Sequence, residues 1–284
     1  MVTSLRYDVE NINMAFLKKF HISTYFLIVV IPLHILAMGM IYYRHEFQPI
    51  HVLYICLIYF LVGGLGLEIG FHRMLSHKNF ALKSSFLEKF FLILGAFAFQ
   101  GSSLAWVALH RNHHTYVDTQ NDHQAPLHGL WSSYIGWTVS PSLTEKIKPS
   151  SIRDLLRSKF HRTLDKYYYQ MIWFTTALIL VFFPIFFFTC YLPGILLSFH
   201  VSSVNNLIGH NLKIGKRPFA VPDWSTDVPW AAVFSWGISY QNTHHKYPDE
   251  MNYGKYSGGI DPAYYIYLGL KNLRLVKTIE TKND

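Results

Sequence analysis

Long apolar stretches separated by polar segments dominate the pattern of this chain. Two runs with at most one charged residue cover residues 25–43 and 51–70, and a third run, 169–210, contains no Lys, Arg, Asp or Glu. Because about 20 apolar residues per helix cross a bilayer core, the third run is long enough for two helices. Pro193 and Gly194 predict a tight turn between them. We therefore expect four transmembrane helices, at residues 25–43, 51–70, 169–189 and 191–210.

The more polar remainder, residues 71–168 and 211–284, predicts a helical cap on one side of the membrane. Within it, residues 86–107 are apolar but interrupted by charged and polar residues. This pattern favours a helix lying in the membrane interface over a fifth span. No repeat, low-complexity tract or interdomain linker is visible. We expect residues 1–284 to form a single all-α integral membrane domain.

The distribution of basic residues orients this domain. Of 25 Lys and Arg, twelve lie between Gly70 and Tyr169, nine follow His210, and only Arg44 separates the first two spans. The positive-inside rule then predicts that both termini and the cap are cytoplasmic. Because the first twenty residues are polar, no cleaved signal peptide is expected.

Composition narrows the chemistry. The chain is 51% hydrophobic and only 15% charged, which excludes an ordinary soluble domain. Both cysteines lie in apolar runs, which excludes a disulfide framework and a cysteine-based metal site. The net charge of +8 favours anionic partners, such as lipid headgroups, acyl-carrier phosphates or an acidic protein. Sixteen histidines are unusual for a membrane protein and point to metal binding.

Histidines gather in short groups at the ends of the spans and in the cap. On a helix, His110, His113 and His114 share one face, so their imidazoles can converge on one small volume. His72 and His77 would stand about 140° apart on an α-helix, which predicts that the helix ends between them. A sulfur-free set of imidazoles suits iron that handles oxygen, and eight of them can furnish two adjacent sites. The remaining groups are Asn206 with His210, and Gln241 with His244 and His245.

These groups resemble the three histidine boxes of the integral-membrane fatty acid desaturases, in the order His72 to His77, His110 to His114 and Gln241 to His245. Asn206 and His210 resemble the Asn-x-x-x-His element of the acyl-CoA Δ9, stearoyl-CoA type branch. The flanking residues match as well, and the resemblance runs from the first span to Leu275. The matching flanks are Gly70-Phe71 before the first box, Asp118-Thr119, Asp122-His123 and Gly136-Trp137 after the second, and Asp261-Pro262 after the third.

The resemblance implies an O2-dependent fatty acyl desaturase that inserts a double bond into a long acyl chain at a non-haem di-iron centre. The implied substrate is an acyl-CoA or acyl-carrier-protein thioester, with a lipid-bound chain as a further possibility. Asn206 is expected to act through a metal-bound water. Because no fused electron carrier is recognisable, electrons are expected from an external ferredoxin or cytochrome b5. The implied iron ligands are His72, His77, His110, His113, His114, His210, His244 and His245.

Three departures from the family pattern bear on this expectation. Gln241 replaces the first histidine of the third box, so one iron is expected to have a weaker or oxygen-donating ligand. Glu68 stands one turn before His72, where it is expected either to orient His72 or to replace the missing ligand. The basic residues that usually follow Gly136-Trp137 are absent, although Arg111 is retained for an anionic carrier. Trp106 and Trp137 are expected to line the substrate tunnel.

Two other kinds of function remain open from the sequence. A di-iron site of this family can also hydroxylate, form a triple bond or decarboxylate an acyl chain, and the boxes do not discriminate among these outcomes. A His-rich protein of four spans could alternatively carry divalent metals, but His34 and His200 are isolated from the clusters, and spans three and four are uncharged. We expect no nucleic-acid partner.

Overall fold

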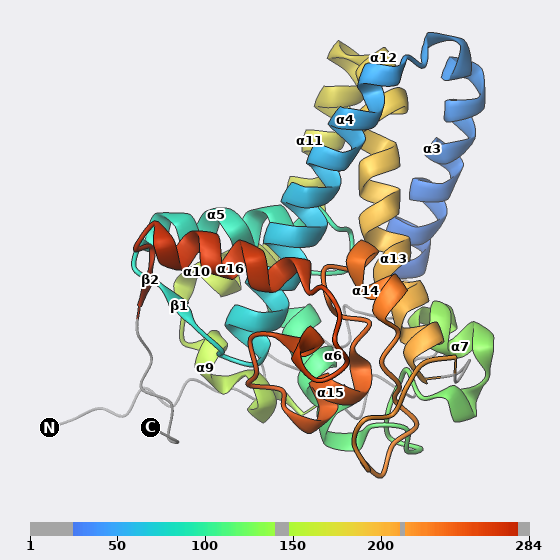
Figure 1. Cartoon of the computed structure of the whole chain (residues 1–284). Coiled ribbons are helices and arrows are strands. Elements are labelled where there is room, and N and C mark those ends of the chain that lie inside the picture. The colour runs from blue at the N-terminus through green and yellow to red at the C-terminus, as the bar shows by residue number, and fades with distance from the viewer. Residues whose placement is uncertain (1–24, 140–147, 211–213, 278–284) are drawn as a thin grey trace, which may run out of the picture.

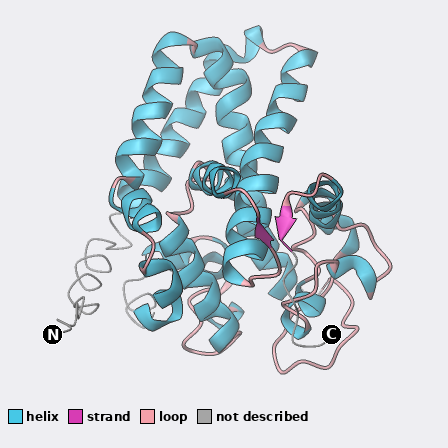
Figure 2. Cartoon of the chain, turned by 90° about the vertical axis from the view of Figure 1, so that its left-hand side faces the viewer, coloured by secondary structure: helices cyan, strands magenta, loops and turns pink. Residues whose placement is uncertain are grey.

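The computed structural model describes residues 25–139, 148–210 and 214–277, and these residues are mostly helical. Long helices stand side by side as upright columns, and shorter helices form a broader body at one end of them (Figures 1 and 2). The columns are η1, Phe26–Val30, with α3, Ile31–Tyr42, and η2, Tyr43–Glu46; α4, Pro49–Tyr59, with η3, Phe60–Ser76; α11, Tyr168–Phe182; and α12, Pro184–Phe186, with η7, Phe187–Tyr191, and α13, Leu192–His210.

Three of these columns are apolar and long enough to cross a membrane, namely Phe26–Glu46, Pro49–Ser76 and Pro184–His210. The remaining column, α11, is apolar but has only 15 residues. The expected turn at Pro193 and Gly194 is wrong, because the chain reverses at Phe183 and Pro184 instead. Pro193 lies inside the continuous helix Pro184–His210, directly after its π-helical stretch Phe187–Tyr191. Gly194 allows close packing, since a Cβ there would lie 2.7 Å from Cβ of Ile58.

The body consists of short helices joined by loops. Its one small sheet pairs β1, Ala81–Leu82, antiparallel with β2, Val276–Lys277. The helices are α5, Ser85–Ala96; α6, Ser103–Tyr116; η4, Pro126–His128; α7, Leu130–Tyr134; η5, Gly136–Val139; η6, Pro149–Ile152; α9, Arg153–Leu156; α10, Lys159–Lys166; α14, Pro229–Phe234; α15, Gln241–Lys246; η8, Tyr253–Lys255; and α16, Pro262–Asn272.

The segment expected to form one interfacial helix is divided into two helices. Helix α5 lies across the columns near the end of η3, beside α16 (Figure 1), and α6 turns away from it into the body. The break follows from the backbone, because Phe99 at φ 59° and Gly101 at φ 106° lie in the left-handed region, which a helix cannot contain. Neither helix is a candidate span among the described residues.

Helix η3 is a π-helix of 17 residues that ends at Ser76, so the expected helix end between His72 and His77 is confirmed. Its hydrogen bonds join residues five apart, as in the bond from His77 N to His72 O of 3.1 Å. Residues five apart therefore come nearly above one another, and the two imidazole centroids are 4.7 Å apart. Helix α5 crosses η3 closely, since a Cβ on Gly66 would lie 2.3 Å from the Gly95 nitrogen.

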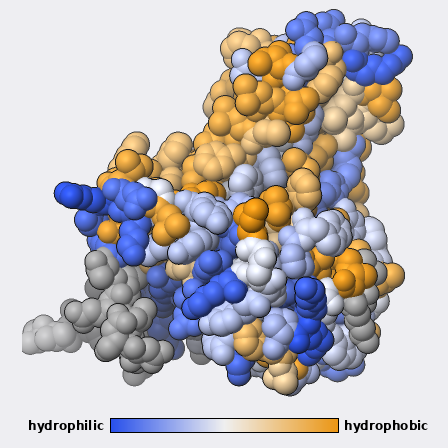
Figure 3. Space-filling model, viewed as in Figure 1, coloured by the Kyte–Doolittle hydropathy of each residue, from blue (hydrophilic) through white to orange (hydrophobic). Residues whose placement is uncertain are grey.

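Surface hydropathy follows this division. The columns present mostly hydrophobic residues along their length, whereas the tip of the columns and much of the body are hydrophilic (Figure 3). Exposed side chains such as Leu27, Ile35, Leu53 and Val181 are 61%, 61%, 62% and 71% accessible. Apolar surface of this kind is stable in lipid and costly in water.

Candidate metal centre

All eight histidines expected as ligands lie together where four elements meet. The end of η3 and the residue after it carry His72 and His77, and α6 carries His110, His113 and His114. Helix α15 carries His244 and His245, and His210 is the last residue of α13. The residues come from distant parts of the sequence, so the tertiary fold alone brings them together.

The first group consists of His72, His77, His110 and His244, with one ring nitrogen of each within 4.8 Å of the others. Nε2 of His72 lies 3.1 Å from Nε2 of His244, and Nε2 of His77 lies 2.8 Å from Nε2 of His110. Imidazoles that face one another in this way direct their lone pairs at a common centre. This arrangement is the one that a nitrogen-ligated cation requires.

The second group consists of His113, His210 and His245, which also lie within 4.8 Å of one another. His114 stands between the two groups, because its Nε2 is 2.8 Å from Nε2 of His244 and its ring centroid is 5.0 Å from that of His245. The eight imidazoles thus form two neighbouring donor sets, of which the second has fewer histidines of its own.

Carboxylates fix the outer nitrogen of four of these rings. Nδ1 of His113 donates to Asp122 at 2.9 Å, that of His210 to Asp118 at 3.2 Å, and that of His245 to Asp223 at 3.1 Å. In the first group, Nδ1 of His72 donates to Glu68 at 3.0 Å. A carboxylate on Nδ1 places the lone pair on Nε2 and fixes the plane of the ring, as is common around protein-bound metals.

The structure therefore has the first of the two arrangements expected for Glu68, in which it orients His72. Glu68 also accepts from Arg73 Nε at 2.7 Å, and Arg73 is completely buried and paired with Asp261 at 3.0 Å. The arginine stacks on Tyr253, with its Cζ 4.4 Å from the ring centroid. This buried chain of charges satisfies Glu68 and offsets the cost of burying a carboxylate.

The roles of the three aspartates are not evident from the sequence pattern. Asp118 and Asp122 flank the second box, but their contacts with His210 and His113 could not be deduced from position. Asp223 has no recognisable signal and reaches His245 only through the loop after α13. Because each carboxylate is itself held by a backbone N–H, from Trp224, Asp118 and Ser225 respectively, the supports are rigid.

The buried nitrogens fit a metal. Among the described residues, Nε2 of His210 and Nε2 of His245 are buried and have no hydrogen-bond partner. Burial lowers the pKa of His110, His114 and His244 well below the usual value, and repulsion among the neighbouring imidazoles lowers it further. These rings are therefore neutral near pH 7, with lone pairs free for a cation.

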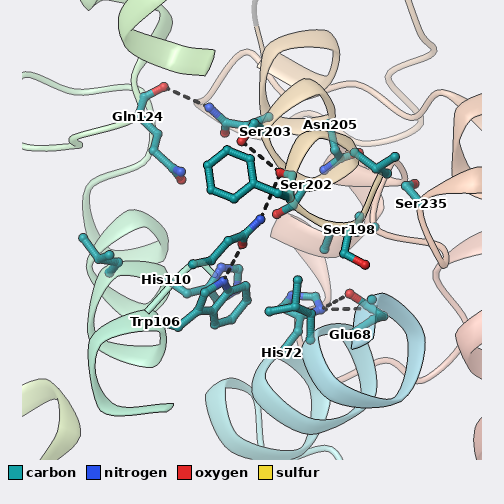
Figure 4. A pocket seen from close by; sticks show the side chains of 18 of the residues that line it. Glu68, His72, Trp106, His110, Gln124, Ser198, Ser202, Ser203, Asn205 and Ser235 are labelled. Carbon is teal, nitrogen blue, oxygen red and sulfur yellow. Dashed lines mark hydrogen bonds and ion pairs between the residues drawn. The ribbon is translucent and has the colours of Figure 1, made fainter. Parts of the chain in front are cut away.

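A pocket opens beside the first group (Figure 4). Its walls include Glu68 and His72 on one side and Trp106 and His110 on another, while Ser198, Ser202 and Asn205 of α13 lie across from them. The Trp106 ring stacks on His110 with centroids 5.0 Å apart, and its Nε1 donates to Gln100 at 3.0 Å. Trp137 also lines the pocket, so both tryptophans expected in the tunnel lie in its wall.

Arg111 has a different environment from the one expected. Its guanidinium donates to the carbonyls of Leu75, Ser76 and Ser151 and bidentately to Asp154, at 2.6–3.2 Å. These five bonds use all five N–H donors. Arg111 thus joins box one to η6 and α9, and its guanidinium has no donor left for the phosphate of a carrier.

The amides near the second group are placed as follows. Asn206 lines the pocket and donates to the carbonyls of Ser133 at 2.8 Å and Gln124 at 3.3 Å, so its contact with a metal-bound water stays a prediction. Gln241 is buried against Gly209, the neighbour of His210, where a Cβ would lie 2.6 Å from Gln241 Cγ. His34 and His200 are remote from the centre and face each other, with Nε2 atoms 3.2 Å apart.

Comparison with known proteins agrees with this geometry. Residues 47–256 match the family model described as fatty acid desaturase. The chain is 31% identical over 233 residues to Delta-9 acyl-lipid desaturase 1 of Arabidopsis thaliana, covering 81% of this chain and 75% of that protein. It is 31% identical over 231 residues to acyl-CoA C20 Delta5-desaturase of Anemone leveillei, covering 80% and 73%. It is 28% identical over 256 residues to sn-1 stearoyl-lipid 9-desaturase of Anabaena variabilis, covering 89% and 88%.

The family match includes all three histidine boxes, at residues 72–77, 110–114 and 241–245. A match of this length, together with the convergence of the histidines, identifies the class of enzyme as an oxidoreductase of lipid metabolism. The chain belongs to the fatty acid desaturase family and is an acyl desaturase.

Proposed function

We propose that the eight histidines hold two iron ions and that the centre desaturates the acyl chain of a membrane glycerolipid. The observation that carries the proposal is the pair of neighbouring imidazole groups whose rings are oriented by buried carboxylates. His72, His77, His110 and His244 would hold one ion, and His113, His210 and His245 the other. His114, which stands between the groups, would complete the second site.

Iron supplies the activation of O2 that amino-acid side chains cannot provide. Overall, two hydrogen atoms leave adjacent methylenes, and together with O2, two electrons and two protons they form two water molecules. The protein contributes position: Trp106 and Leu109 form a wall for the chain beside His110. The carboxylates keep the Nδ1 protons in place, so that the Nε2 atoms stay available as ligands.

The glycerolipid is favoured over a soluble thioester by two observations. Arg111, the basic residue retained for an anionic carrier, has all its donors engaged within the protein. Two of the three relatives described above are named for acyl lipids and one for acyl-CoA. Acyl-CoA and acyl carrier protein are the alternatives that the experiment below distinguishes.

Electrons would come from a separate donor, a ferredoxin or cytochrome b5, on the cytoplasmic side.

We infer that α11 is the fourth crossing, since it stands beside the other columns (Figure 1). The metal centre, at the opposite end from Glu46, would then be cytoplasmic. A cysteine placed at Ser150 should react only with reagents that enter the cell, and one at Glu46 with external reagents. The predicted cytoplasmic positions of Met1 and Asp284 lie outside the described residues.

The decisive experiment is expression in a host that lacks its own desaturase, followed by mass spectrometry of each lipid class. We expect new double bonds in glycerolipids and about two iron ions per purified chain. Isotope-labelled stearoyl-CoA and stearoyl-phosphatidylglycerol, each added to purified enzyme, separate the two carriers. Hydroxylated, acetylenic or shortened chains would show instead that the centre hydroxylates, forms a triple bond or decarboxylates. Membership in an enzyme family leaves the divalent-metal carrier without support.

A further inference from the structure

The second column forms part of the pocket wall. Tyr59, Gly63 and Leu67 line the pocket, and all three lie within the membrane-spanning helix Pro49–Ser76. Facing them, Trp236 lines the same pocket from the loop between α14 and α15. At this point the wall is closed by an exposed hydrogen bond from the Tyr59 hydroxyl to the Phe234 carbonyl.

The Trp236 side chain fills this part of the wall and packs against two glycines of η3. A Cβ on Gly63 would lie 3.1 Å from Trp236 Nε1, and one on Gly64 would lie 3.3 Å from Cδ2 of the indole. The indole also contacts Tyr59 and Phe60, with ring centroids 5.1 and 5.8 Å apart. At Gly63 and Gly64 no side chain of η3 holds the indole in place, so the contact with Phe60 is the η3 side-chain contact that the ring must break to leave.

The backbone at Trp236 is strained. Trp236 has φ 57°, in the left-handed region that a bulky residue rarely occupies. The next residue, Gly237, has φ 94°, and a Cβ there would lie 2.1 Å from Asp261 Oδ1. Such strain persists only where the surroundings impose it, and it is released when the segment moves.

The outer face of this wall suits lipid. Helix α14 buries Ala231 and Ala232 and exposes Trp230, Val233 and Phe234, which are 63%, 44% and 67% accessible. An exposed tryptophan beside apolar side chains is typical of a membrane interface. The segment that closes the pocket therefore presents an outer face that a bilayer would cover, and in a bilayer a two-chain lipid is the abundant acyl compound.

We propose that Trp236 and α14 form a lateral door, through which one acyl chain of a membrane glycerolipid enters the pocket directly from the bilayer, between η3 and α14. This inference rests on the proposed function and adds the route of the substrate and the residue that controls it. The glycerol and headgroup stay at the membrane surface while the chain slides past Trp236 toward His72 and His110. No bond is made or broken in this step.

A cross-link that holds the door shut tests the proposal. Phe60→Cys and Phe234→Cys place one thiol on each side of the closure, in a protein whose native cysteines are removed by Cys56→Ser and Cys190→Ala. Neither phenylalanine lines the pocket. A flexible bis-maleimide joins the two thiols in detergent-solubilised, iron-loaded enzyme, and distearoyl-phosphatidylglycerol is added before or after linking. Excess lipid is removed, and dithionite and O2 drive one turnover, so that no electron-transfer partner is required.

Enzyme loaded before linking should form close to one product per chain, and enzyme linked before loading at least tenfold less. Equal yields in the two orders would overturn the proposal, as would absence of product after prior loading. Single-cysteine proteins treated with the same reagent serve as matched controls and should not depend on the order of addition. If the proposed function itself fails, the unlinked protein will contain no iron and form no product, a result that the linking experiment does not produce.

Discussion

At the scale of residues, the centre is defined by pairs rather than by histidines alone. His113, His210 and His245 each donate through Nδ1 to an aspartate, and none of the three aspartates is exposed. Burial by itself would raise the pKa of Asp223, but its hydrogen bond and charge interaction with His245 hold that pKa well below its usual value. The aspartate is thus ionised whenever the site is folded, and it keeps its histidine in the tautomer that can bind a metal.

Asp223→Asn tests this pairing. An amide can offer its NH2 group to Nδ1 and so allow the wrong tautomer, and we expect iron affinity and turnover to fall about 10- to 100-fold. Iron per chain and the desaturation rate are the measurements. Asp249→Asn, at an exposed position in the loop after α15, is the matched control and should change neither. Full iron content in Asp223→Asn would mean that the pairing serves only the fold.

The two unusual residues near the centre can be tested together. Glu68 orients His72 in the first group, whereas Gln241 lies against Gly209 beside the second group. We expect Glu68→Thr to lower turnover about 10- to 100-fold and Gln241→His to raise iron retention. Because the two residues serve different groups, the free-energy changes of iron binding and of turnover measured for each single variant should add in the double variant. A coupling above about 0.5 kcal/mol would show that Glu68 compensates for the missing histidine.

At the scale of elements, the π-helix η3 and its crossing with α5 position the first box. The bonds between residues five apart align His72 with His77. The crossing at Gly66 and Gly95 brings the two backbones together, because neither residue has a side chain to separate them. Arg111 then ties the end of η3 to α9 through Asp154. The geometry of box one is therefore fixed by packing at several points.

Gly66→Ala should disturb this crossing. Its Cβ would lie 2.3 Å from the Gly95 nitrogen, a backbone atom that cannot rotate away. We expect a loss of about 1–3 kcal/mol of stability, typical of overpacking, and reduced iron content. Gly269→Ala in α16 is the matched control, because its Cβ meets nothing within 4 Å. Thermal unfolding should show the first variant destabilised and the second unchanged or about 1 kcal/mol more stable. Equal melting temperatures would refute the tight crossing.

At the scale of the whole molecule, buried polar contacts join the start of α6 both to the column α11 and to α10. Tyr168, the first residue of α11, accepts from Gly101 N at 3.0 Å. From α10, Asp165 accepts from the Ser102 hydroxyl, and His161 bonds Ser103 at 2.8 Å. Burial raises the pKa of Asp165 to about 7, although the Ser102 bond partly opposes this. The Asp165 carboxyl, which bonds Ser102 directly before α6, is thus protonated in mildly acidic solution.

This gives a prediction for stability against pH. Asp165 in the unfolded chain loses its proton near pH 4 but keeps it to about pH 7 when folded, so the free energy of unfolding falls as pH rises through that window. Asp165→Asn removes the ionisation and should be more stable than the parent above pH 7, by at most about 4 kcal/mol. The difference should vanish near pH 4. Thermal unfolding in detergent from pH 4 to 8 measures it, and a constant difference would contradict the raised pKa.

Sequence patterns reached the class of fold through local rules, and the resemblance to the desaturases supplied the expected members of the site. Apolar runs predict helices in membranes, and the spacing of His110, His113 and His114 places them on one helix face, as found in α6. The patterns failed where local signals have two meanings. Pro193 and Gly194 indicate a turn, but here they lie inside a continuous helix, where Gly194 permits close packing against Ile58. Arg111 looked available for a ligand because its five acceptors lie in two segments distant from it in the sequence, residues 75–76 and 151–154.

By itself, the sequence determined where the apolar runs and the grouped histidines lie, because hydropathy and residue type are properties of single positions, and these predict a membrane protein whose chemistry depends on imidazoles. The resemblance to the desaturases implied which histidines these are. Only the tertiary structure decided how the imidazoles divide into two groups and which carboxylate orients each of four rings. It also decided that Trp236 closes the pocket wall over Gly63 and Gly64. These features depend on contacts between residues far apart in the sequence, such as His72 and His244, which are 172 positions apart. Such contacts are set by the packing of whole helices, which no local pattern records.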